Sequence, residues 1–133
     1  MASAAYRPEV VAEPRTVLLV EDEALLRMLM AELLRGAGLR VIEAATADEA
    51  VAVLDAGLHL DMVFTDVRMP GRMDGVGLAL TVRRDRPEVA VLVTSGDLAP
   101  DIARQMPAFI PKPYDLDAVV VQILDRLDAP VPE

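Results

Sequence analysis

The sequence has no cysteine and no tryptophan, and only two tyrosines, two phenylalanines and one histidine occur in its 133 residues. Without cysteine the chain has no disulfide, no thiolate nucleophile and no cysteine-based metal site. Because aromatic side chains are so few, Val, Leu, Ile, Ala and Met must build the core, and 53% of the chain is hydrophobic. The length is that of one domain with a proper core.

Long apolar runs and excess positive charge are also missing. No apolar run reaches the length needed to span a bilayer, and the N-terminus lacks the basic-then-apolar pattern of a secretion signal. The formal net charge is −9, which argues against non-specific binding to nucleic acids. We therefore expect a cytoplasmic protein that neither binds DNA nor inserts into membranes.

Apolar segments of two kinds alternate along the chain. Short continuous runs between turn residues are typical of strands buried on both faces, and they predict strands at residues 16–20, 40–44, 62–66, 89–94 and 108–110. Longer segments predict helices at residues 24–35, 46–56 and 75–86, a short helix from residue 100, and a final helix after residue 115. This alternation implies an α/β fold with a five-stranded parallel sheet, helices on both faces and the flavodoxin-like order 2-1-3-4-5.

Three of the helices carry specific expectations. The segment 24–35 has a broad apolar side, made of Leu25, Leu26, Met28, Leu29, Leu33 and Leu34. Thr46 and Glu49 have the spacing of a capping box, which predicts that the second helix starts there. The fourth helix must be short, because Pro100 can open it and Pro107 follows soon after.

Carboxylates follow two of the predicted strands. The strand at 62–66 ends on Asp66, and the strand at 16–20 runs into Glu21-Asp22-Glu23. Taken alone, the acidic run also fits a helix N-terminus with favourable charges, and Asp66 also fits a turn or a helix cap. Because both groups are expected at the carboxyl edge of one sheet, where ligands bind, together they suggest a pocket for a hard cation.

Five features at matching strand ends resemble the receiver domain of two-component response regulators. They are Glu21-Asp22, Asp66 with Met69-Pro70 after it, Asp74-Gly75, Ser95-Gly96 and Lys112-Pro113. No single feature is specific, but their order and spacing are typical of the family. The resemblance covers roughly residues 15–128, which leaves residues 1–14 as a flexible N-terminal tail and 129–133 as a C-terminal tail.

The resemblance implies phosphotransfer to an aspartate, which by position is Asp66. A sensor histidine kinase or a histidine phosphotransfer protein would donate the phosphoryl group, giving an acyl phosphate. Mg²⁺ would be bound directly by Asp22 and Asp66, by Glu21 through a water, and by the backbone carbonyl of Arg68. The single histidine, His59, is expected at the opposite end of the sheet from the acids, so it is not a phosphoryl carrier.

The resemblance also assigns roles to Ser95, Lys112 and Phe109. The Ser95 hydroxyl would meet a phosphoryl oxygen, and the Lys112 ammonium would pair first with Asp66 and then with the phosphoryl group. Phe109 would be the aromatic residue of the switch, which acts through the face formed by the fourth helix, the fifth strand and the fifth helix. On their own, these residues also fit a Ser-Gly turn, a solvated lysine and a core phenylalanine.

Departures from the family pattern concern the loops. The loop after Pro70 is one residue longer than the common form. The fourth helix is shortened, so the sequence does not identify the downstream target or decide whether the protein forms a homodimer. Arg68 and Asp97 lie two residues after Asp66 and Ser95, so the resemblance implies that both side chains overhang the phosphorylation site. They would then form a partial lid over it; the alternative is that both side chains are simply solvated.

Other functions are weaker alternatives to a stand-alone receiver. Such a receiver would bind a target, relay phosphate or drain it from a kinase, and it would not turn over an external substrate. A haloacid dehalogenase-type hydrolase needs a second acid two residues after the nucleophile, where this chain has Arg68. A degenerate receiver is disfavoured, because the acid, hydroxyl and lysine positions are all filled.

Overall fold

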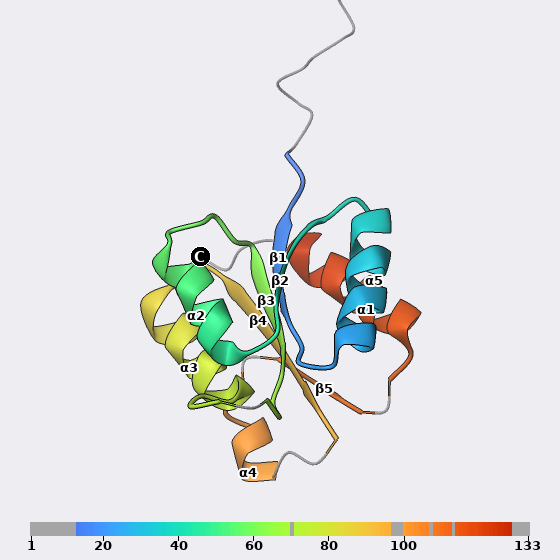
Figure 1. Ribbon diagram of the computed structural model, residues 1–133. Helices are drawn as coiled ribbons and strands as arrows, with labels where there is room; N and C mark the ends of the chain where they lie inside the picture. Colours follow the sequence, from blue (N-terminus) through green and yellow to red (C-terminus); the bar gives the residue numbers. More distant parts are fainter. Residues whose placement is uncertain (1–12, 70, 97–99, 107, 113, 129–133) are drawn as a thin grey trace, which may run out of the picture.

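The computed structural model describes residues 13–69, 71–96, 100–106, 108–112 and 114–128. Within these residues, strands and helices alternate along the chain (Figure 1). The elements are β1 (Thr16–Val20), α1 (Ala24–Gly36), β2 (Arg40–Ala44), α2 (Ala47–Asp55), β3 (Met62–Asp66), α3 (Gly75–Asp85), β4 (Ala90–Ser95), α4 (Pro100–Ala103), β5 (Phe109–Pro111) and α5 (Leu116–Asp128).

The five strands form one parallel sheet in the order β2-β1-β3-β4-β5, as predicted. Helices α1 and α5 cover one face, and α2 and α3 cover the other (Figure 1). In the register, Val20 of β1 pairs with Thr65 of β3, and Asp66 pairs with Thr94 of β4. The carboxyl ends of β1, β3 and β4 therefore lie side by side, at the edge where the acids were expected.

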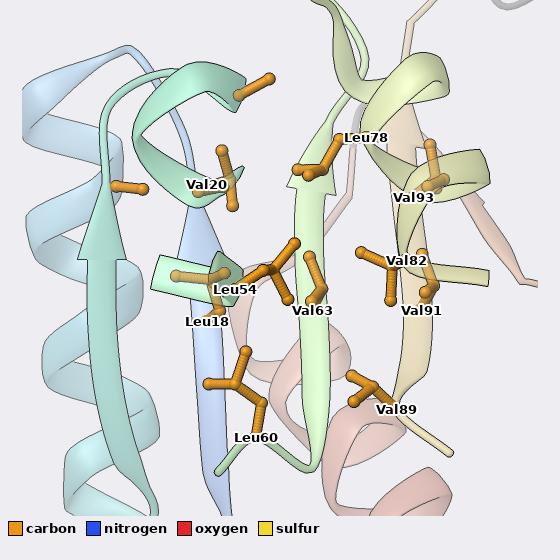
Figure 2. Packing of buried hydrophobic residues seen from close by; sticks show 14 of the residues in the cluster. Leu18, Val20, Leu54, Leu60, Val63, Leu78, Val82, Val89, Val91 and Val93 are labelled. Carbon is orange, nitrogen blue, oxygen red and sulfur yellow. The ribbon is translucent and has the colours of Figure 1, made fainter. Parts of the chain in front are cut away.

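Side-chain alternation along the strands divides the core into two layers. Leu18 and Val63 point to the face covered by α2 and α3, where they belong to the same core cluster as Val82 of α3, as Figure 2 shows. The residues next to them in sequence, Leu19 and Phe64, pack on the other face against α1 and α5. Strands β1 and β3 are buried along their whole length, because both of their faces are covered and neither strand lies at an edge of the sheet.

Side-chain caps fix the starts of two helices. The Thr46 hydroxyl accepts a hydrogen bond from the Glu49 backbone N–H at 3.1 Å, which confirms the predicted start of α2. The Glu49 carboxylate accepts from the Ala45 N–H at 2.9 Å, one residue before the cap itself. Asp74 caps α3 by accepting from the Gly77 N–H at 3.0 Å, and α4 has four residues, so it is as short as predicted.

Half of the apolar residues predicted on one side of α1 are not covered. Leu25, Met28 and Leu29 are 63%, 53% and 42% exposed, whereas Met30, Ala31 and Leu34 are buried. The reason is that α1 shares its face of the sheet with α5. Only a narrow stripe of α1 meets the sheet and α5, so apolar residues outside that stripe remain at the surface.

Two strands are each shifted by one residue from the predicted range. Strand β4 ends at Ser95, not at Thr94, and β5 runs over Phe109–Pro111, because Ser95 pairs with Pro111 and its carbonyl accepts from the Lys112 N–H. Most of the two predicted tails lies outside the described residues, and residues 13–15 have no helix or strand. Among the described helices, none has the length and hydropathy of a membrane span.

Candidate functional site

Asp66 is the last residue of the central strand β3 and is only 6% exposed. Its Oδ1 accepts a hydrogen bond from the Arg68 backbone N–H at 3.2 Å. Its Oδ2 lies 2.7 Å from the ammonium Nζ of Lys112, which is 46 residues away in the sequence. A buried carboxylate at a strand end is thus held from both sides, with its charge balanced by one lysine.

Glu21, Asp22 and Asp66 bring one carboxylate oxygen each to within 4.8 Å of one another. Burial raises the pKa of Glu21 to about 7; its hydrogen bond from the Glu23 N–H (2.9 Å) lowers it, and the nearby Asp66 carboxylate raises it further. Crowded carboxylates repel one another, and a divalent cation relieves this repulsion. An all-oxygen donor set at this spacing fits Mg²⁺.

Lys112 is positioned by the sheet. Directly after β5, its backbone N–H donates to the Ser95 carbonyl at 3.0 Å, which aligns the ends of β4 and β5. Burial opposes its charge, but the hydrogen bond to Asp66 and the carboxylates of Asp66 and Glu21 together raise its pKa. Lys112 therefore stays a cation and can balance anionic charge at this edge.

Gly75 explains why α3 can start so close to Asp66. A Cβ atom at Gly75 would lie 2.1 Å from the Asp66 carbonyl oxygen and 2.7 Å from the Val67 Cα. The Gly75 N–H donates to the Val67 carbonyl at 2.9 Å. Asp74 thus caps the helix, and Gly75 has no side chain that would block this close approach.

A comparison with protein families agrees with this geometry. Residues 17–124 match the family model described as the response regulator receiver domain. The chain belongs to the response regulator receiver family. Receivers are signalling domains that are phosphorylated on an aspartate by histidine kinases or phosphotransfer proteins, and they bind Mg²⁺ at an acidic pocket.

Individual relatives show how this receiver domain occurs in longer proteins. The chain is 36% identical over 119 residues to "Sensor kinase CckA" of Brucella abortus, which covers 85% of this chain and 12% of that protein. It spans between 12% and 56% of the length of the curated relatives that it matches first. The match to CckA is thus a match to one part of a larger kinase.

Solved structures share the fold. A response regulator receiver protein from Sinorhizobium medicae has a TM-score of 0.80 and 28% identity, over 88% of this chain and 97% of that one. The response regulator TrrA of Thermotoga maritima, solved in complex with Mg²⁺-BeF, has a TM-score of 0.74 and 21% identity, over 85% of this chain and 98% of that one. The flavodoxin-like fold predicted from the sequence is thereby confirmed.

The structure brings most of the predicted receiver residues together, but not all of them. Ser95 ends β4 at the same sheet edge and is buried. Phe109 is half-buried and packs against the core layer under α2 and α3. Arg68 is exposed, whereas Asp97 lies outside the described residues, so the lid stays a prediction. As predicted, the exposed His59 precedes β3, at the opposite end from the acids, where its Nε2 lies 3.3 Å from Asp61 Oδ1.

Two further residues lie in this region, and the sequence analysis assigned no role to either of them. Tyr114, two residues after Lys112, is half-buried; burial raises its pKa, Lys112 lowers it, and the carboxylates of Glu21 and Asp66 raise it. The Thr94 side chain is fully buried next to Asp66 in the register. The spacing from Lys112 could have indicated Tyr114, but Thr94 looks like any residue of a buried strand.

Proposed function

We propose that this receiver accepts a phosphoryl group on Asp66 and thereby switches its binding to a protein partner through the α4-β5-α5 face. The proposal is carried by one observation. Asp66 is the acid that contacts the lysine and also belongs to the three-carboxylate cluster. This is the only position among the described residues where a nucleophile, an anion-binding cation and a cluster of metal-ligating oxygens meet.

The chemistry follows from the residues at the sheet edge. A carboxylate oxygen of Asp66 attacks phosphorus, the phosphorus–nitrogen bond of the donor phosphohistidine breaks, and an acyl phosphate forms. Asp22 and Asp66, with Glu21 through a water and the Arg68 carbonyl, would hold Mg²⁺, which would supply charge neutralisation when bound. Lys112 leaves the Asp66 carboxylate for the new phosphoryl oxygens.

Ser95 is expected to donate its hydroxyl to another phosphoryl oxygen. The Ser95 carbonyl accepts a hydrogen bond from the Lys112 N–H, so a movement of either residue would shift the other. Phe109 pairs with Val93 in the register, two residues before Ser95. We propose that this connection carries the phosphorylation signal to the α4-β5-α5 face.

The donor protein is expected to cover the N-terminal part of α1. Transfer requires the donor histidine to come within about 3–3.5 Å of Asp66, so the surface around the site is buried in the transfer complex. That surface includes the exposed Leu25, Met28 and Leu29 of α1. Beside them is a hollow of about 510 Å³, lined by Leu26, Gly96, Lys112, Tyr114 and Leu116.

Incubation with acetyl phosphate and Mg²⁺, followed by intact-mass measurement, tests this function. We expect one phosphoryl adduct on the wild-type protein and none on Asp66→Asn, which keeps the shape of the side chain and removes the nucleophile. Adduct formation at the wild-type rate in Asp66→Asn would move the site elsewhere. Repeated release of phosphate without an adduct would favour the hydrolase alternative.

A further inference from the structure

Thr94 has a buried hydroxyl that the fold does not use. The residue is 1% exposed, and among the described residues its Oγ1 has no hydrogen-bond partner. The neighbouring strand provides a contrast, because the equally buried Thr65 donates its hydroxyl to the Asp66 carbonyl at 2.9 Å. Buried polar atoms are almost always satisfied by protein or by ordered water, so the Thr94 hydroxyl requires a partner.

A small hollow beside Thr94 offers room for such a partner. It has a volume of about 10 Å³ and lies between the sheet and α1. Its polar lining comes from Glu21, Asp66, Thr94 and Tyr114, and the remaining lining residues are apolar. A space of about this size holds one water molecule, and it is too small for an organic ligand or a hydrated cation.

We propose that this hollow binds one water molecule, which joins the Thr94 hydroxyl to the Glu21 carboxyl group. Thr94 is then a positioning residue for the acidic cluster. An internal water needs two to four polar partners, and Tyr114 is available as a third, because it lines the same hollow. The apolar remainder of the lining keeps the water from exchanging freely with bulk solvent.

The consequence concerns Mg²⁺, so this step rests on the proposed function. Glu21 is expected to reach the ion through a water. The orientation of the Glu21 carboxylate depends on what binds the carboxylate oxygen that does not accept from the Glu23 N–H. Outer partners of metal ligands typically change affinity by about 10–100-fold when they are removed. The Thr94 hydroxyl should therefore strengthen Mg²⁺ binding although it does not touch the ion.

The first test detects the water directly, in the protein without Mg²⁺. NMR cross-relaxation between water and the Thr94 methyl group should reveal a long-lived internal water in the wild type. The signal should disappear in Thr94→Val, which replaces the hydroxyl by a methyl group of similar size. It should persist at Thr94 in Thr65→Val, because Thr65 points to the opposite face of the sheet. No long-lived water in the wild type, or an unchanged one in Thr94→Val, would overturn the proposal.

The second test measures the Mg²⁺ dissociation constant by titration in variants whose folding is checked by urea unfolding. We expect Thr94→Val to bind Mg²⁺ about tenfold more weakly, and Thr94→Ser, which keeps the hydroxyl, to bind like the wild type. Equal weakening in both variants would mean that Thr94 acts through its methyl group, against the proposal. If Thr94→Val does not fold, the water signals of wild type and Thr94→Ser decide.

The two proposals fail in different ways. Loss of phosphorylation at Asp66 with an intact water signal and an intact effect of Thr94 on Mg²⁺ would refute the proposed function alone. Normal phosphorylation at Asp66 without the internal water would refute the role of Thr94 alone.

Discussion

Glu21 should make the folded protein less stable as the pH rises in the absence of Mg²⁺. Burial raises its pKa from 4.5 to about 7. Between these pH values the folded state keeps a proton that the unfolded chain releases, so the free energy of unfolding falls with rising pH. The two pKa values, converted at about 1.36 kcal/mol per pH unit, give a decrease of about 3 kcal/mol across this window.

Urea unfolding at a series of pH values measures this decrease. The free energy of unfolding of the wild type, minus that of Glu21→Gln, should fall by about 3 kcal/mol from the acidic to the neutral end of the window. Glu23→Gln is the matched control, because it removes an exposed acid from the same turn, and it should keep the wild-type slope.

Saturating Mg²⁺ should offset the loss at neutral pH, because the ion binds the deprotonated carboxylate and only in the folded state. Parallel curves for the wild type and Glu21→Gln without Mg²⁺ would refute the reasoning, since Glu21 would then titrate alike in both states.

Three further predictions concern the same edge of the sheet. Asp22→Ala should lose Mg²⁺ binding in titrations of the unphosphorylated protein, and an unchanged titration would remove Asp22 from the ligand set. Gly75→Ala should lower the free energy of unfolding by about 3 kcal/mol, because its Cβ would collide with the Asp66 backbone; Gly36→Ala, which meets nothing within 4 Å, is the control and should be near neutral. If Arg68 and Asp97 form a lid, the Arg68→Ala and Asp97→Ala variants should each shorten the phosphoryl half-life, and the double variant should add nothing; four equal half-lives would exclude the lid.

The sequence alone was enough for the fold and for the members of the acidic cluster. Buried strands and amphipathic helices differ in the period of their apolar residues, so each element could be recognised locally. Thr46 caps its helix from an adjacent turn, which also makes it a local signal. Asp22 follows β1, and Asp66 ends the parallel strand β3. The carboxyl ends of such strands share one edge, so the meeting of the two acids followed from topology.

Only the tertiary structure decided which atoms occupy the same space. The exposure of Leu25 depends on how α5 shares a sheet face with α1, and the sequence of α1 alone does not predict that packing. The need for a glycine at position 75 comes from the Asp66 carbonyl, which reaches it across the turn between β3 and α3. That the Thr94 hydroxyl has no partner among the described residues depends on what surrounds it in three dimensions. Periodicity identifies the type of each element, but segments distant in the chain decide which of its apolar residues are covered and which atoms touch.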